Sequence, residues 1–318
     1  MRKRTSILLI VLLVLIALAG LMFIPFGGEE DVGPIERPDR PMKTVEDMTG
    51  RKVEIPQEPH NILSMCTTVT DTIMRLGESR RLRGIGIEST CIPGTELARV
   101  LGKGAEIARR QIKATGIDLA FVWADEEAAA KKLQDLGVPM LKVKYPRAKE
   151  VPDVVRFVGQ CLGREEDTEK MLKPVEEFLK QQESRPEPEE RPTVYLELKA
   201  DYSTAGSDSY INDLITYAGG RNIAASNEGF GPLKPEKIVE ADPDVILYVE
   251  EYKEYRAIMS RQALQGLKAI RKEHIAPVKR YWLVPGVGLP NAAASFQASI
   301  KNPKKPKGYE DILKPEDL

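Results

Sequence analysis

The segment that most constrains the fold is an amphipathic, highly charged stretch at residues 164–184, near the middle of the chain. Its apolar residues recur with helical spacing and predict a single buried stripe: Met171, Leu172, Val175, Phe178 and Leu179. Acidic residues precede basic ones by four positions three times in this segment, which also favours a helix. On both sides, strand-like apolar runs alternate with helical ones. We therefore predict an α/β protein in which one helix joins two halves.

Prolines indicate where this helix changes or ends. Pro174 predicts either a kink or the first turn of a shorter helix. Pro186, Pro188 and Pro192 alternate with charged residues and predict a stiff, extended connector. The predicted domains are therefore residues 43–163, a linking helix at 164–185, and residues 186–318.

Composition excludes several classes of protein. The 318 residues suffice for two cores of ordinary domain size. A net charge of -1 argues against a nucleic-acid-binding protein, which would be strongly basic. Three cysteines without a CxxC spacing and only two histidines argue against a zinc motif or a histidine-rich metal site. We predict no metal centre and no cofactor.

The N-terminus predicts a membrane-directed segment at residues 1–26. Three basic residues at positions 2–4 precede an apolar run at 7–26, which is long enough to span a bilayer. The basic flank predicts that the rest of the chain lies outside the cytoplasm. Both an uncleaved anchor, which we favour, and a cleaved signal peptide fit this pattern. Residues 27–42, rich in glycine, proline and charge, predict a spacer.

Each half predicts a mainly parallel sheet built from βα units. A hairpin flanks the turn at 47–50, and strands are expected at 61–65, 82–87, 118–123 and 140–144. In the second half, strands are expected at 194–198, 244–249 and 280–284, and helices at 209–218 and 235–241. The basic, proline-rich residues 301–307 predict a solvated tail.

Common catalytic motifs are absent from the sequence. It contains no GxSxG, no HExxH and no phosphate-binding loop that ends in Gly-Lys-Ser/Thr. Three Gly-x-Gly runs, at 84–86, 229–231 and 286–288, lack the third glycine of a dinucleotide loop. Cys66 at a predicted helix start leaves open an extracellular α/β enzyme that uses this thiol.

The ends of the predicted strands indicate a binding site. In open α/β sheets, ligands bind beyond the carboxyl ends of the strands, and two such sheets would face each other across a cleft. Aromatic and hydroxyl side chains at these positions suit a sizeable, partly apolar ligand, although each of them could equally serve core packing or helix capping. The predicted ligand-binding residues are Ser64, Cys66, Thr67, Glu88, Ser89, Trp123, Tyr145, Tyr202, Ser203, Tyr248, Glu250 and Trp282.

Two cysteines follow neighbouring predicted strands. Cys66 and Cys91 would lie at the same edge of a parallel sheet, where the strand spacing of about 4.8 Å is compatible with a disulfide. Two free thiols packed under the loops, or soft metal ligands, are the alternatives. We predict the disulfide, and we expect Cys161 to be a small buried apolar residue.

Three segments carry a resemblance to a known family: residues 45–65, 194–225 and 233–248. The second and third contain DLI-x-x-AGG-x-NIA and PE-x-I-x-x-x-x-PD in that order. The chain resembles the substrate-binding proteins of ABC importers for iron–siderophore complexes, haem or cobalamin, over roughly residues 44–290. This resemblance implies two Rossmann-like lobes, a rigid linking helix with limited lobe motion, and a ligand between the lobes. It also implies permease docking through one glutamate on each lobe, which would be Glu96 and Glu236.

The sequence departs from the family at three places. A proline is missing before Asp118, and Cys66 replaces a small residue in the first pocket loop. The segment 292–308 stands where the family has its C-terminal helix, so we expect no such helix after the last strand.

These patterns and the resemblance together predict an extracytoplasmic, membrane-anchored, monomeric solute-binding protein. It would capture a metal chelate and deliver it to an ABC permease and its ATPase, without being an enzyme. A siderophore, haem, a corrinoid and a small oxyanion all remain open as ligands. The alternatives are the Cys66-dependent enzyme and a ligand-sensing ectodomain.

Overall fold

The computed structural model describes residues 33–35, 39–104, 106–186, 188–250 and 252–303. The predicted anchor at 1–26 and most of the predicted spacer lie outside these residues, as does most of the predicted tail. Within the part of the chain that the structure describes, no helix is long and apolar enough to cross a membrane.

The first lobe is built on a six-stranded sheet in the order β6-β5-β4-β3-β7-β8. All neighbours are parallel except β5 and β6. A separate antiparallel hairpin precedes it, as predicted. The strands are β1 (Met42–Glu46), β2 (Lys52–Pro56), β3 (Ile62–Ser64), β4 (Leu82–Gly86), β5 (Arg99–Lys103), β6 (Glu106–Ile107), β7 (Leu119–Trp123) and β8 (Met140–Val143).

Helices cover both faces of this sheet because its central strands are apolar on both sides. One face carries Ile62, Ile85 and Phe121 and packs against α2 (Thr67–Arg75) and α5 (Val151–Leu162). The other face packs against α3 (Arg109–Thr115) and α4 (Glu127–Asp135), where Leu133 is fully buried.

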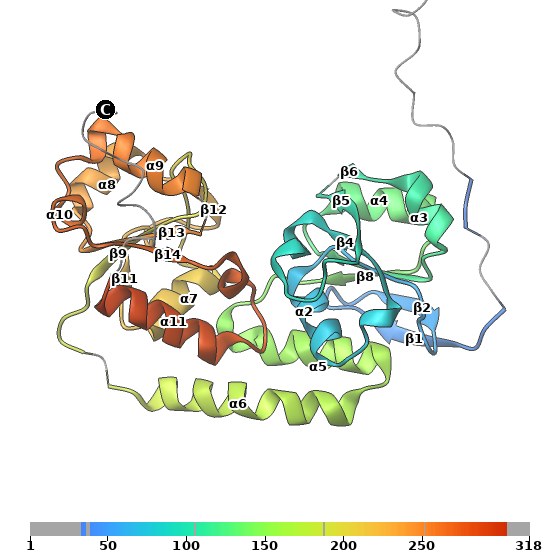
Figure 1. Ribbon diagram of the computed structural model, residues 1–318. Helices are drawn as coiled ribbons and strands as arrows, with labels where there is room; N and C mark the ends of the chain where they lie inside the picture. Colours follow the sequence, from blue (N-terminus) through green and yellow to red (C-terminus); the bar gives the residue numbers. More distant parts are fainter. Residues whose placement is uncertain (1–32, 36–38, 105, 187, 251, 304–318) are drawn as a thin grey trace, which may run out of the picture.

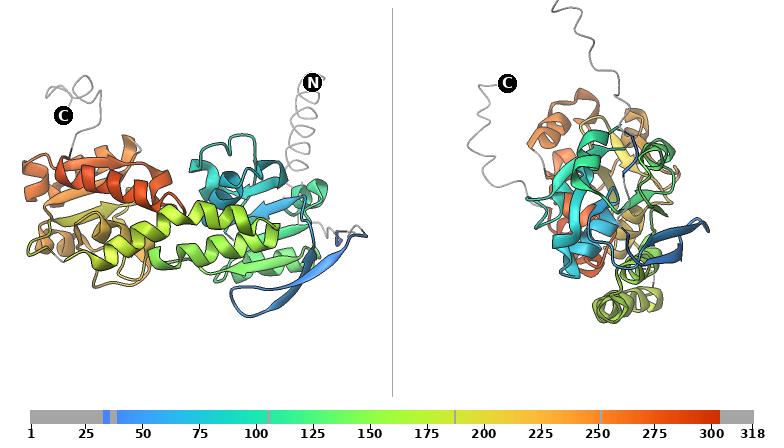
Figure 2. Two further views of the ribbon diagram at one scale, coloured as in Figure 1. Left: turned by 90° about the horizontal axis from the view of Figure 1, so that it is seen from below. Right: turned by 90° about the vertical axis from the view of Figure 1, so that its right-hand side faces the viewer.

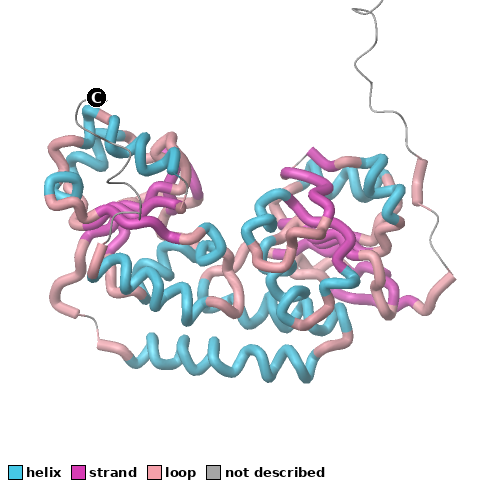
Figure 3. The backbone as a smooth tube through the Cα atoms, in the orientation of Figure 1, coloured by secondary structure: helices cyan, strands magenta, loops and turns pink. Residues whose placement is uncertain are grey.

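The second lobe is built on a four-stranded parallel sheet in the order β11-β9-β13-β14. Its strands are β9 (Thr193–Glu197), β11 (Arg221–Asn222), β13 (Val245–Val249) and β14 (Ile275–Val278). An antiparallel ribbon pairs β10 (Ser203–Ala205) with β12 (Phe230–Pro232). The helices are α7 (Tyr210–Tyr217), α8 (Pro235–Ala241), α9 (Tyr252–Ser260), α10 (Lys268–Arg271) and α11 (Leu289–Lys301). The two sheets are separate in space (Figure 3).

A 20-residue helix, α6 (Glu165–Ser184), runs along one side of both lobes (Figure 1). It is about 30 Å long at 1.5 Å per residue, and it lies beside α5 in every view (Figure 2). Arg156 of α5 donates from Nε to Glu169 of α6 at 2.7 Å and also pairs with Glu176. Pro174 lies inside α6 on its exposed side and does not end the helix. The predicted fold class, two α/β lobes joined by one long helix, is confirmed.

Two predictions near the C-terminus are wrong. Residues 280–284 do not form a strand, because Arg280–Leu283 is a short 3₁₀ helix, η5. The last strand is instead β14, which contains Pro277 and lies at the edge of the sheet, where a missing N–H is tolerated. A C-terminal helix is also present: Ala292, Ala293 and Phe296 of α11 are buried in the second-lobe core.

Candidate functional site

Three aromatic rings form a continuous row from the first lobe to the second. Trp123 ends β7, Tyr145 follows β8, and Phe230 begins β12. The ring centroids of Trp123 and Tyr145 are 5.2 Å apart, and those of Tyr145 and Phe230 are 5.7 Å apart with an interplanar angle of 85°. Tyr145 is 38% exposed and Phe230 is 53% exposed. This row, the inter-lobe aromatic row, therefore presents apolar surface to solvent where the lobes meet.

A second contact between the lobes is polar and centred on Asp71 of α2. Its nearly buried carboxylate accepts hydrogen bonds from Arg75 Nε at 2.9 and 3.0 Å and from the Tyr281 hydroxyl of η5 at 3.0 Å. Arg75 also donates to the Tyr281 hydroxyl. Burial raises the pKa of Asp71 in spite of the neighbouring guanidinium, and it raises the pKa of Tyr281 to about 12. We call Asp71, Arg75 and Tyr281 the inter-lobe polar triad.

Gly286 permits the close approach at this triad. A Cβ at position 286 would lie 2.6 Å from Asp71 Oδ2, which is closer than two such atoms can pack. The nearby Gly288 similarly faces Arg75 Nη2, at 3.3 Å from its hypothetical Cβ. The Gly-x-Gly run at 286–288 is therefore explained by contact between the lobes rather than by nucleotide binding.

Tyr210, in the first turn of α7, has a buried hydroxyl near the inter-lobe aromatic row and the inter-lobe polar triad. Its pKa is raised well above the ordinary value, first by burial and then by the neighbouring Tyr145 and Asp71. Among the described residues this hydroxyl has no hydrogen-bond partner. A buried hydroxyl without a partner costs free energy.

Carboxylates dominate the first-lobe side of the site. Asp125 and Glu126 lie two and three residues after Trp123, and Glu88 lies in the short 3₁₀ helix η2 (Ile87–Cys91) after β4. The pKa of Glu126 is raised by burial and by the charges of Asp125 and Glu88. Three carboxylates therefore follow the carboxyl ends of β4 and β7.

Four of the predicted ligand-binding side chains are buried within a lobe. Ser64 donates to the Cys66 carbonyl at 2.9 Å, and Thr70 links Ser64 to Ser89 at 2.8 and 3.0 Å. Tyr248 is 2% exposed and packs on Tyr255 in the second-lobe core. The side chains of Ser64, Cys66, Ser89 and Tyr248 stabilise the lobe interiors, and a role in ligand contact stays a prediction for them.

The other eight predicted residues are partly or fully exposed: Thr67, Glu88, Trp123, Tyr145, Tyr202, Ser203, Glu250 and Trp282. Trp123 and Tyr145 are brought together by the aromatic row. Trp282 stacks against Tyr281 with ring centroids 5.2 Å apart. The guanidinium of Arg261 covers the Tyr202 ring at 3.9 Å from its centroid. A role in ligand contact stays a prediction for these eight.

Sequence reasoning missed Phe230, Asp71, Arg75 and Tyr281. Phe230 offered a signal, since an aromatic residue between two glycines in a short polar segment is unusual for a core position. Asp71 and Tyr281 lie 210 residues apart, and their contact has no local signal.

The three cysteines are free thiols, so the predicted disulfide between Cys66 and Cys91 is wrong. Cys66 is fully buried before α2, whereas Cys91 ends η2 and donates its own thiol to the Glu88 carbonyl at 3.3 Å. Different loop lengths after β3 and β4 place the two thiols in these separate environments. Cys161 is buried in α5, as expected.

Comparison with known proteins supports a common origin. The chain is 22% identical over 296 residues to an uncharacterized ABC transporter substrate-binding lipoprotein of Bacillus subtilis, covering 87% of this chain and 90% of the relative. It is 25% identical over 253 residues to a cobalamin-binding protein of Halobacterium salinarum, covering 74% of this chain and 67% of the relative. The structure of a periplasmic heme-binding protein from Pseudomonas aeruginosa superposes with a TM-score of 0.67 at 21% identity, covering 78% of this chain and 95% of that one.

The family described as periplasmic binding protein matches residues 118–280, which is about half of the chain. This range runs from β7 through α6 to η5 and so includes the linking helix and the second-lobe sheet. The lobes, the helix that joins them and the sequence match agree, and the chain belongs to the periplasmic binding protein family.

Proposed function

We propose that this protein is the extracytoplasmic receptor of an ABC importer, held at the membrane by its N-terminal segment, and that it binds a metal chelate between its lobes. The inter-lobe aromatic row is the observation that carries this proposal. Exposed rings from both lobes, within 6 Å of one another, suit a ligand with a large apolar face that contacts both lobes at once. The relationship to a cobalamin-binding protein supports this ligand class.

Two further features favour a chelate over a bare ion. Within the described residues, no group of three or more His, Cys, Asp or Glu side chains could hold a metal ion. His60 and His274 precede β3 and β14 and so lie at the amino ends of these strands, whereas the aromatic row follows the carboxyl ends of β7 and β8. The ligand would therefore bring its own metal ligands. The carboxylates of the first lobe would repel a small oxyanion and favour a ligand that is neutral or positively charged at that edge.

Cys66 gains no support as a catalytic nucleophile. Its thiol is fully buried, and burial together with the charges of Glu126 and Asp125 raises its pKa well above the ordinary value. A reactive thiolate requires the opposite environment. The described contacts therefore favour the binding-protein proposal over the extracellular enzyme.

A thermal-stability panel tests the ligand class. We expect a corrinoid, a haem or a ferric siderophore to raise the melting temperature of the detergent-solubilised full chain, because a ligand that binds only the folded state stabilises it by about 2.7 kcal/mol at 100 times its Kd. Molybdate should leave the melting temperature unchanged. A shift with molybdate and none with any chelate would contradict the proposed ligand.

We further propose that Glu236 docks to the permease, with Glu96 as the candidate on the first lobe. Both side chains are exposed, and Glu236 lies in the first turn of α8. Glu236→Lys should reduce transport at least tenfold, because a salt bridge to the permease becomes a repulsion, while the ligand Kd stays unchanged. Glu240→Lys, at the other end of the same helix, is the matched control. Normal transport by Glu236→Lys would exclude this docking role.

A further inference from the structure

A surface cavity of about 410 Å³ lies on the first lobe at the end opposite to the ligand site. It is formed at the amino ends of β3, β4 and β5 and at the last turn of α3, whereas the aromatic row follows the carboxyl ends of β7 and β8. Its volume falls in the range of about 300–1,000 Å³ that is usual for ligand pockets. The cavity is therefore distinct from the site between the lobes.

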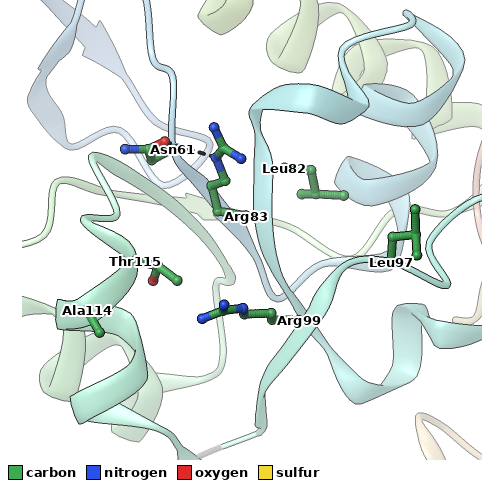
Figure 4. A pocket seen from close by; sticks show the side chains of 7 residues that line it. All are labelled: Asn61, Leu82, Arg83, Leu97, Arg99, Ala114 and Thr115. Atoms are coloured by element: carbon green, nitrogen blue, oxygen red, sulfur yellow. Dashed lines mark hydrogen bonds between the residues drawn. The ribbon is translucent and has the colours of Figure 1, made fainter.

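Two arginines give this cavity a positive charge. Arg83 and Arg99 both line this cavity, and Figure 4 shows the guanidinium of Arg83 beside Asn61 and that of Arg99 on the side of Thr115. Asn61 accepts from Arg83 Nε at 3.1 Å and itself donates to the Gly116 carbonyl at 3.1 Å, so it fixes the orientation of one guanidinium. Among the described residues, the terminal nitrogens of Arg83 and the guanidinium of Arg99 have no partner, and no acidic residue lines the cavity.

The arrangement of the two arginines requires an explanation. Arg99 on β5 pairs with Gly84 on the neighbouring strand, one residue beyond Arg83. The two charges are near neighbours without being directly opposite, and an anion between them would lower their repulsion. Guanidinium groups match phosphate oxygens with paired N–H donors, so a phosphoryl group is the anion that fits them best.

Apolar surface and the path of the chain indicate where such a phosphate would come from. Leu97, at the cavity rim, is 98% exposed. Lys113 of α3 donates to the Gly33 carbonyl at 2.9 Å, two residues before Thr115 at the cavity wall. The described residues 33–35, which follow the proposed anchor and spacer in the sequence, therefore lie at this end of the lobe.

We propose that this cavity binds the phosphate-bearing headgroup of an anionic membrane lipid, with Leu97 against the lipid's apolar part. The proposal rests on the proposed anchoring at the membrane. Arg83 and Arg99 hold the phosphate, and the contact orients the first lobe on the bilayer. Binding weakens as salt concentration rises, because both charges are exposed.

Soluble short-chain lipids test this site on the full chain in neutral detergent. Dihexanoyl phosphatidylglycerol, dihexanoyl phosphatidylcholine and inorganic phosphate are titrated separately, and hydrogen–deuterium exchange of the segment 94–103 reports binding. We expect phosphatidylglycerol to protect this segment, and Arg83→Gln or Arg99→Gln to weaken its binding about tenfold each. Leu97→Ser should weaken binding of the lipid but not of phosphate.

Arg221 is an exposed arginine of the second lobe. The variant Arg221→Gln is therefore the matched control and should bind lipid normally. If Arg99→Gln and Arg83→Gln bind phosphatidylglycerol as tightly as this control, the site is excluded. If phosphatidylcholine protects the segment as strongly as phosphatidylglycerol, charge plays no role. If inorganic phosphate binds as tightly as phosphatidylglycerol and Leu97→Ser has no effect, the ligand is not a lipid. The two arginine variants should still bind the chelate normally, so failure here is distinguishable from failure of the proposed function.

Discussion

Replacing Arg261 with alanine should lower the free energy of unfolding by about 3–5 kcal/mol, the usual cost of breaking a buried ion pair. Arg261 Nη1 donates to Glu197 Oε2 at 2.7 Å, and the two side chains are 13% and 0% exposed. Tyr195 also donates to this carboxylate, at 3.1 Å. Without the guanidinium, a fully buried carboxylate keeps only hydrogen bonds from neutral groups, those of the Tyr195 hydroxyl and the Tyr202 backbone. Chemical denaturation of the variant and the parent protein measures the loss.

The free energy of unfolding of Arg261→Ala should depend more strongly on pH than that of the parent protein. Burial raises the pKa of Glu197 above its ordinary value of 4.5, while Arg261 opposes this shift. The folded protein therefore holds the proton more tightly than the unfolded chain, and stability falls as the pH rises from about 4.5 through the raised pKa. Removing Arg261 raises the pKa further, so the deficit of the variant should be larger at pH 7 than at pH 4.

Glu197→Gln combined with Arg261→Ala provides the control, because it removes the buried charge as well as its partner. The double variant should recover part of the lost stability and lose the added pH dependence. A deficit below about 1 kcal/mol in Arg261→Ala, or one that does not vary with pH, would show that Glu197 is not stabilised by this pair.

Replacing Asp71 with alanine should cost about 2–3 kcal/mol, the usual value for hydrogen bonds to a charged group. It leaves the Tyr281 hydroxyl and the Arg75 guanidinium without their acceptor, although Arg75 is 35% exposed and water can reach it. Tyr281→Phe, which removes only the hydroxyl, should cost about 1 kcal/mol. Both values follow from denaturation curves.

Tyr217→Phe is the matched control for the triad, since the Tyr217 ring packs on Phe178 and is also half-buried. It should change stability by less than about 0.5 kcal/mol. If Tyr281→Phe is no more destabilising than this control, the triad does not hold the lobes together.

Much of the fold was predictable because it depends on local patterns. Apolar runs bounded by turn residues predicted the central strands β3, β4, β7, β9 and β13. The apolar stripe within a highly charged segment predicted α6. β14 was missed because Pro277 breaks the usual strand pattern, which only an edge position tolerates. The sequence did not predict α11, since its few large apolar residues meet their partners only in the folded core.

The site was less predictable because strand ends do not reveal which way a side chain points. Trp123 and Tyr145 face the other lobe, whereas Ser64 and Tyr248, at equivalent strand positions, face the interior. Phe230 depends on the pairing of β10 with β12, in which Ala205 lies opposite Phe230. Such pairings and inter-lobe contacts are tertiary, so a single sequence carries little information about them.

The aromatic row can be tested directly by the affinity of the chelate that gives the largest thermal shift, measured for two variants. Phe230→Leu removes a ring whose centroid lies 5.7 Å from that of Tyr145, with an interplanar angle of 85°. Phe178→Leu is the control, because it removes a ring away from the site that packs on Tyr217 in the same way, at 5.7 Å and 84°. We predict one-to-one binding by the parent protein and a Kd about tenfold weaker for Phe230→Leu, with the Kd of Phe178→Leu unchanged. Equal Kd values for both variants and the parent protein would contradict a ligand site between the lobes at this row.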